Sequence, residues 1–161
     1  MPEVGLGLGG NVGDPAETIR AALALLDERG IVRIDKASSF YRTAPWGGVP
    51  QPDYANCCAI GRTELTPFAL LEAIKALEIE LGRVETMRWG PRSIDIDILY
   101  YGVLAMQDER LVIPHRDLLN RAFVLIPLAE IAPDLVIAGR RVADAARDFG
   151  GEGVRPWTSA P

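Results

Sequence analysis

Two acidic side chains stand two residues apart in a short apolar run, preceded by a tryptophan and two arginines. Asp95 and Asp97 alternate with isoleucines in the stretch IDIDIL, and the residues before it read RWGPRS. In an extended strand, residues i and i+2 point to the same face, so we expect both carboxylates on one face and the isoleucines on the other, in the core. Two adjacent carboxylates repel each other, and one of them keeps its proton unless cations neutralise the pair.

Divalent cations would neutralise such a pair. Mg²⁺ binds one or two carboxylates together with phosphate oxygens and water, and two Mg²⁺ ions held by the pair would suit phosphoryl or pyrophosphoryl transfer. An exposed strand face with solvated acids is the plain alternative, which the D-x-D pattern alone favours. The neighbouring residues favour the metal site over solvated acids. Arg88 and Arg92 can bind phosphate bidentately, and Trp89 offers a flat face to a planar ring.

A second group of cations surrounds the single histidine of the chain. His115 lies in the stretch PHRDLLNR between Arg116 and a proline, with Arg121 at the end of the stretch. A lone histidine is often structural, but one among cations in an expected loop fits a phosphate contact or a proton donor. The arginines between residues 83 and 121 indicate a small-anion site, with ordinary surface charge as the alternative.

The elements that must position these residues alternate between strand and helix patterns. We expect strands at residues 4–10, 31–43, 54–63 and 92–102. Asp14, Pro15 and Glu17 predict the start of a first amphipathic helix, which Gly30 ends. A second helix begins after Thr66 and ends at Gly82. A Pro/Gly-rich loop, residues 44–53, follows the second strand. A polar loop, residues 84–91, precedes the fourth strand.

The second half of the chain has a weaker pattern. Residues 104–114 predict a hairpin, and residues 115–137 predict short helical pieces broken by Pro127 and Pro133, followed by a strand. The Gly/Pro-rich residues 150–161 predict a loose C-terminal tail. The absence of a strict βαβ rhythm favours an α+β sheet covered by helices, in a single domain of residues 1–161.

Composition narrows the class of protein. A chain of 161 residues that is 48% hydrophobic suits one globular domain. Its net charge of −5 and pI of about 4.9 argue against a nucleic-acid surface. The N-terminus lacks a signal-peptide pattern and no apolar run approaches membrane-spanning length, so we expect a cytoplasmic protein without membrane contact. The adjacent Cys57 and Cys58 point to opposite faces of a strand, which argues against a disulfide between them.

A glycine-rich stretch near the N-terminus suggests a dinucleotide site, but only weakly. GLGGNVG, residues 7–13, lies between an expected strand and an expected helix, and Asp35 follows near the distance of a ribose contact. Its spacing is G-x-G-G-x-x-G, which differs from the G-x-G-x-x-G fingerprint. A tight strand-to-helix turn is the favoured reading. A nicotinamide-dependent oxidoreductase built on this stretch stays open as a minor alternative, as does a non-catalytic nucleotide- or pterin-binding module.

Taken together in order, several motifs resemble the 6-hydroxymethyl-7,8-dihydropterin pyrophosphokinase family. They are GGNVGD, SSFYRTAPWG, QPDYANC, ELGRVETMRWGPRSIDIDILYYG and PHRDLLNRAFVLIPLAEIAPDL, between residue 5 and about residue 137. The resemblance implies transfer of the β,γ-pyrophosphoryl group of ATP to the pterin hydroxymethyl group in folate biosynthesis, with release of AMP. It also implies a ferredoxin-like mixed sheet with helices on both faces, in three layers.

The resemblance implies roles for individual residues. Asp95 and Asp97 would hold two Mg²⁺ ions, and the catalytic set would be Arg83, Arg92, Asp95, Asp97 and His115. The residues implied for ATP are Glu78, Arg88, Trp89, Arg92, Ile98, Arg110, His115 and Arg121. Those implied for the pterin are Thr43, Ala44, Trp46, Tyr54, Asn56, Trp89, Asp95 and Phe123. Partners would be these two small molecules alone, and we expect a monomer.

Overall fold

A central antiparallel sheet carries the acid pair on one of its strands. The computed structural model describes residues 1–45, 48, 50–82, 93–151 and 153–158. The strands run in the order β10-β3-β4-β1-β5, and β2 pairs with β4 as well. Their bounds are β1 (Glu3–Gly10), β2 (Arg33–Ala37), β3 (Tyr41–Thr43), β4 (Tyr54–Arg62), β5 (Asp95–Tyr101) and β10 (Val154–Pro156).

The expectation of a mixed sheet was wrong. Every pairing between the described strands of this sheet is antiparallel. Strands joined through a helix do run in the same direction, but another strand lies between them: β4 separates β1 from β2, and β1 separates β4 from β5. The result is an α+β fold in which β1 is a central strand and β5 pairs with it along one side.

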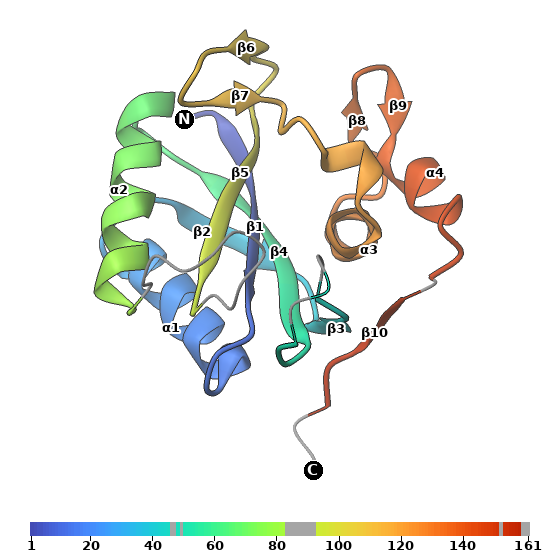
Figure 1. Ribbon diagram of the computed structural model, residues 1–161. Helices are drawn as coiled ribbons and strands as arrows, with labels where there is room; N and C mark the ends of the chain where they lie inside the picture. Colours follow the sequence, from blue (N-terminus) through green and yellow to red (C-terminus); the bar gives the residue numbers. More distant parts are fainter. Residues whose placement is uncertain (46–47, 49, 83–92, 152, 159–161) are drawn as a thin grey trace.

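Helices lie on both faces of the sheet, as Figure 1 shows, with α1 and α2 on one side and α3 and α4 on the other. Their bounds are α1 (Pro15–Glu28), α2 (Pro67–Glu80), α3 (Ala122–Ile131) and α4 (Val142–Arg147). Each side has its own buried cluster. Ile19, Leu70 and Ile96 belong to the first, and Leu99 and Leu125 to the second. None of the helices within the described ranges is long and apolar enough to cross a membrane.

The first two helices begin at the expected capping residues. The Asp14 side chain accepts a hydrogen bond from the Glu17 N–H at 3.2 Å, and that of Thr66 accepts one from the Ala69 N–H at 3.3 Å. These bonds satisfy N–H groups that have no partner inside the helix. Gly30 follows α1 at φ 67°, where glycine avoids the steric cost of a side chain. The predictions for these helices are confirmed.

Residues 31–43 form two strands along β4, where the sequence predicted one. The break falls at Ser38, whose N–H donates to the Cys58 carbonyl at 2.8 Å while its Oγ accepts the Cys58 N–H at 3.0 Å. Glu130 of α3 accepts the next N–H, that of Ser39, at 2.9 Å. Side-chain groups thus replace the regular ladder at this point, and they tie the sheet to α3.

Residues 104–137 include the expected hairpin of β6 (Met106–Gln107) and β7 (Val112–Ile113), followed by the 3₁₀ helix η1 (Leu118–Asn120). The predicted break at Pro127 was wrong, because α3 continues through it. Proline removes one backbone donor from a helix, and burial of α3 against the sheet offsets that loss.

The strand expected at the end of residues 115–137 is present as β8 (Val136–Ile137), but the elements after it were not predicted. β8 pairs with β9 (Arg140–Arg141), and α4 follows where no helix was predicted. In the C-terminal stretch, β10 pairs with β3. The Trp157 N–H then donates to the Phe40 carbonyl at 2.9 Å.

We predict that Gly61→Ala destabilises the fold, because a Cβ at this position would lie 2.8 Å from a Val32 methyl and closer still to the Arg33 carbonyl oxygen. Such overpacking costs about 1–3 kcal/mol. Urea unfolding measures this loss. Gly7→Ala is the matched control, because its Cβ would meet only Leu99 carbons at 3.4 Å or more. Equal stability of the two variants would contradict the prediction.

Candidate functional site

A cavity of about 400 Å³ opens on the side of the sheet that faces α3. Strands β1, β3, β4 and β5 and the segment from η1 into α3 contribute its lining. Eight of the residues that the sequence singled out line it: Thr43, Ala44, Tyr54, Asn56, Asp95, Asp97, Arg121 and Phe123. Strands and loops far apart in the sequence therefore bring most of the expected pterin residues and both acids to one place.

The acid pair faces this cavity, as alternation predicted. Ile94, Ile96 and Ile98 are buried on the opposite face, whereas Asp95 and Asp97 are half-buried and line the cavity. Their partners across the β1–β5 ladder are both glycines, Gly9 for Asp95 and Gly7 for Asp97. The acids therefore have no neighbouring side chain on β1.

The donor set fits a hard divalent cation that completes its coordination with other oxygens. Within the described residues, no group of three or more acidic, histidine or cysteine side chains gathers as a metal cage. Two carboxylates at an open cavity are the arrangement in which Mg²⁺ takes its remaining ligands from phosphate and water.

The opposite part of the cavity is built around a buried amide. The Asn56 Nδ2 donates to the Thr43 Oγ1 at 2.6 Å, and both side chains are buried. Gly9 lies so close that a Cβ there would be 2.6 Å from the Asn56 Oδ1. The amide plane is therefore fixed from two sides. With Tyr54 and Phe123 in the same lining, it forms a polar edge beside aromatic surfaces, which suits a flat heterocycle.

Several lining residues were missed from the sequence. They are Gly7, Leu8, Gly9, Cys57, Cys58, Asp117, Asn120 and Val124. The alternating glycines of β1 were a usable signal, because a strand with glycine at every second position leaves one face open to a close approach. The glycine-rich stretch thus contributes to the site through strand β1, and the turn that follows it is not part of the lining.

The two cysteines are buried and chemically quiet. Burial raises the pKa of Cys57 to about 12, and it raises the pKa of Cys58 well above its usual value. Both thiols therefore stay protonated at neutral pH, which confirms the reading of small apolar strand residues. The Cys58 thiol donates to the Val124 carbonyl at 3.4 Å, from β4 to α3.

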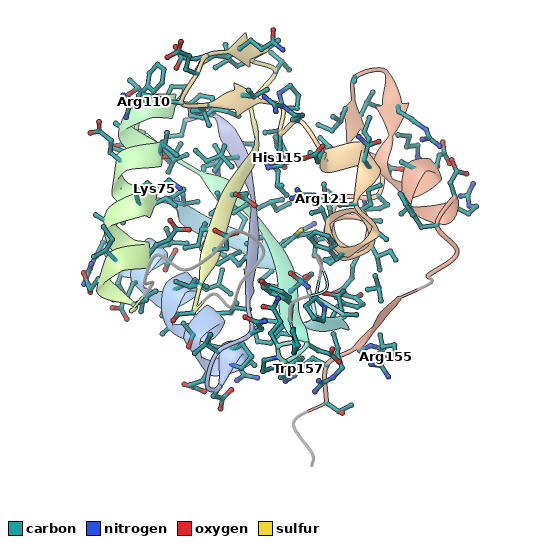
Figure 2. All side chains as sticks on the ribbon, in the orientation of Figure 1. Lys75, Arg110, His115, Arg121, Arg155 and Trp157 are labelled. Atoms are coloured by element: carbon teal, nitrogen blue, oxygen red, sulfur yellow. The ribbon has the colours of Figure 1, made fainter. Side chains whose placement is uncertain are left out.

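His115 and Arg121 lie on the segment between β7 and α3, as Figure 2 shows. The His115 backbone N–H donates to the Leu99 carbonyl on β5 at 2.8 Å, and its Nδ1 accepts the Asp117 N–H at 3.1 Å. Nδ1 is therefore an acceptor, which leaves Nε2 to carry the proton of a neutral ring. Arg121 pairs with Asp117 at 3.2 Å, and its guanidinium lies 5.5 Å from the Phe123 ring centroid.

Four described residues expected at the nucleotide do not line the cavity: His115, Glu78, Ile98 and Arg110. Glu78 is buried in α2 and accepts the Ile96 N–H at 2.7 Å, so it fixes the backbone between the two acids. Ile98 is a buried core residue. Arg110 lies near one end of α2 (Figure 2), where it pairs with Glu72 at 3.2 Å.

Five further expected site residues lie outside the described residues. They are Trp46, Arg83, Arg88, Trp89 and Arg92. The phosphate-binding arginines and one wall for the pterin ring therefore stay predictions from the sequence.

We predict that the single histidine titrates below its ordinary pKa of 6.5. Burial lowers the pKa of His115 most, and the positive charge of Arg121 lowers it further. One imidazole resonance should therefore show a midpoint below 6.5 in a proton NMR titration. Arg121→Gln should move the midpoint upward, whereas Arg147→Gln, on α4, should not. A midpoint at or above 6.5 would contradict the placement of the ring.

We also predict that Glu78→Ala lowers stability by about 1–3 kcal/mol, the usual cost of a buried donor left without its partner. The Ile96 N–H loses its acceptor in this variant. Chemical denaturation measures the change. Lys75→Ala is the control, because the Lys75 ammonium is half exposed and lies 3.7 Å from Glu78, so its loss should cost little.

The sequence of this chain is similar to a known protein family and to several named proteins. The family model described as 7,8-dihydro-6-hydroxymethylpterin-pyrophosphokinase (HPPK) matches residues 5–133. Among proteins named 2-amino-4-hydroxy-6-hydroxymethyldihydropteridine pyrophosphokinase, that of Methylorubrum extorquens is 47% identical over 96% of this chain and 98% of its own length. That of Haemophilus influenzae is 44% identical over 85% of this chain and 86% of its own.

Solved structures agree with the fold. A Plasmodium falciparum HPPK-DHPS triple mutant with STZ-DHP superposes with a TM-score of 0.75 at 15% identity, over 92% of this chain. The chain spans 43% of the length of that structure, so the likeness concerns one part of a longer protein and shows the fold alone. The sequence matches carry the assignment: the chain belongs to the 7,8-dihydro-6-hydroxymethylpterin-pyrophosphokinase family.

Proposed function

We propose that the chain transfers the pyrophosphoryl group of ATP to the hydroxymethyl group of 6-hydroxymethyl-7,8-dihydropterin, in folate biosynthesis. The observation that carries this is the meeting of the acid pair and the fixed Asn56 amide in one cavity, in a member of this family. One end of the cavity suits phosphates with their cations. The other suits the polar edge of a pterin.

In this proposal the acceptor hydroxyl attacks the β-phosphorus of ATP. The bond from that phosphorus to the oxygen bridging it to the α-phosphate breaks, and AMP leaves. Two Mg²⁺ ions would be held by Asp95 and Asp97 and would supply neutralisation of the phosphate charge. The chain's own part is positioning and electrostatics. The strand fixes the two carboxylates, and Arg121 adds a cation at the cavity wall.

The pterin would lie between aromatic side chains with its amide-like edge on Asn56. The Asn56 Oδ1 would accept from ring N–H groups, and the second Nδ2 hydrogen, which Thr43 does not take, would donate to a ring acceptor. Phe123 supplies one stacking surface, and Trp89 would supply the other. Tyr54 and Ala44 complete the wall on the side of β3 and β4.

Finer features of the protein belong to the same proposal. The order β-α-β-β-α-β, with β2 and β3 taken as one broken strand, fits a ferredoxin-like fold of three layers in a single domain. A cytoplasmic monomer with ATP and the pterin as its only partners suits the acidic surface and the small-molecule cavity.

A turnover assay tests the activity. With Mg²⁺ present, AMP should form from ATP only when hydroxymethyldihydropterin is added. Formation of ADP, or no turnover with that pterin, would overturn the proposal. Binding of both ligands without AMP release would favour a non-catalytic module, and binding of NADH would favour an oxidoreductase.

We predict that Asp97→Ala lowers kcat by about 100-fold or more, because several kcal/mol of charge stabilisation is lost and each 1.36 kcal/mol is a factor of about ten. The far-UV circular dichroism spectrum should stay unchanged. Asp108→Ala is the matched control, since it removes an exposed acid between β6 and β7. A wild-type rate in the Asp97 variant would remove the role of the acid pair.

A further inference from the structure

The C-terminal strand β10 lies outside residues 5–133, which the family model matches, yet it pairs with β3, a strand that contributes to the cavity lining. Strand β3 ends in the lining residue Thr43 and has three residues. On one side it pairs with β4, where Thr43 lies opposite Tyr54. On its other side it pairs with β10, where Thr43 lies opposite Val154. Without β10, this short strand would be an edge strand held from one side only.

Side chains reinforce the same connection. The Trp157 ring lies 4.1 Å from the Arg42 guanidinium carbon, which is a close cation–π contact. Asp53 forms ion pairs with two arginines, with its Oδ2 3.6 Å from the Arg42 guanidinium and 3.7 Å from that of Arg155. Asp53 directly precedes Tyr54, another lining residue. Figure 2 shows Arg155 and Trp157 on the C-terminal segment at this end of the sheet.

These contacts differ in how much they contribute to holding β10 and β3 together. Ion pairs between exposed side chains contribute little, and Arg155 is 70% exposed. The backbone ladder and the stacked Trp157 therefore carry most of the connection. The Trp157 N–H bond to the Phe40 carbonyl fixes the ring just before β3 begins. Because a strand of three residues has few contacts of its own, its position depends on these two neighbours.

We propose that β10 and Trp157 position strand β3 and thereby set the affinity of the cavity for its heterocyclic substrate. This rests on the proposed function for the identity of that substrate. Trp157 does not line the cavity, so it acts through Arg42 and the β3 backbone as a positioning residue. The phosphate end of the cavity, built on β5, has no contact with this strand in the sheet order.

Trp157→Ala in the full-length chain tests the proposal. We expect the Kd for 6-hydroxymethylpterin, measured by titration calorimetry, to rise about three- to tenfold, while the Kd for a non-hydrolysable ATP analogue with Mg²⁺ stays within about twofold. The pterin KM should rise more than kcat falls. Trp157→Phe keeps an aromatic face over Arg42 and should recover most of the affinity. Arg140→Ala, in the β8–β9 hairpin, should change neither.

A second readout does not depend on the substrate. Amide hydrogen exchange at Tyr41–Thr43 should be faster in Trp157→Ala than in the wild type, with exchange at β5 unchanged. Deletion of residues 154–161 should enlarge both effects. Wild-type exchange at β3, or equal loss of pterin and nucleotide affinity in the point variant, would overturn the proposal. Absence of pterin turnover in the wild type would instead count against the proposed function and leave the exchange test valid.

Discussion

The fold depends on one constraint, the alternation of side chains along β5. The same seven residues must fill the core with isoleucines on one face and present two like charges on the other. Apolar burial can offset the cost of bringing the charges together, because the strand cannot rotate without exposing its isoleucines. Glu78 adds a buried acceptor for the amide between the acids. Packing of the β5 isoleucines in the core therefore determines which way the two carboxylates point.

The face of the sheet toward α1 and α2 contributes mainly to stability, and the face toward α3 carries the cavity that would recognise ligands. The cluster beneath α1 and α2 is apolar and continuous, and it includes the buried isoleucines of β5. The face toward α3 is interrupted by the cavity, by the broken strand at Ser38 and by polar contacts such as that of Glu130 with Tyr41 at 2.5 Å. Buried polar groups need partners, and α3 supplies several of them while it closes the cavity.

Local sequence signals correctly predicted the features that depend on interactions between residues close in the chain. Capping residues located α1 and α2, and period-two alternation located the face of Asp95 and Asp97. The antiparallel sheet was not predictable in this way, because strand order depends on long-range pairing that no local pattern records. The same holds for β10, whose three residues form a strand only against β3. The predicted helix break at Pro127 was wrong because proline is a local signal that burial of α3 overrides.

The candidate site shows the same division. The acids were predicted from residue type and spacing, whereas Asn56 and Phe123 were implied by the family resemblance, and all four side chains meet in the cavity. Glu78 and Ile98 were placed at the nucleotide by resemblance, but the structure buries Glu78 in α2 and Ile98 on the core face of β5. The glycines of β1 were expected in a strand and in the turn that follows it, but not in the site, since residue type alone does not tell which strand will lie opposite the acids.

The bare face of β1 has a consequence for inhibition. Gly7 and Gly9 present main-chain atoms to the cavity, and main-chain atoms are the same whatever side chain a gene encodes. A compound that draws its affinity from the main chain at Gly9 would be hard to escape by mutation of that residue. A larger residue at Gly9 would press on Asn56, so a resistant variant would impair its own recognition of the substrate.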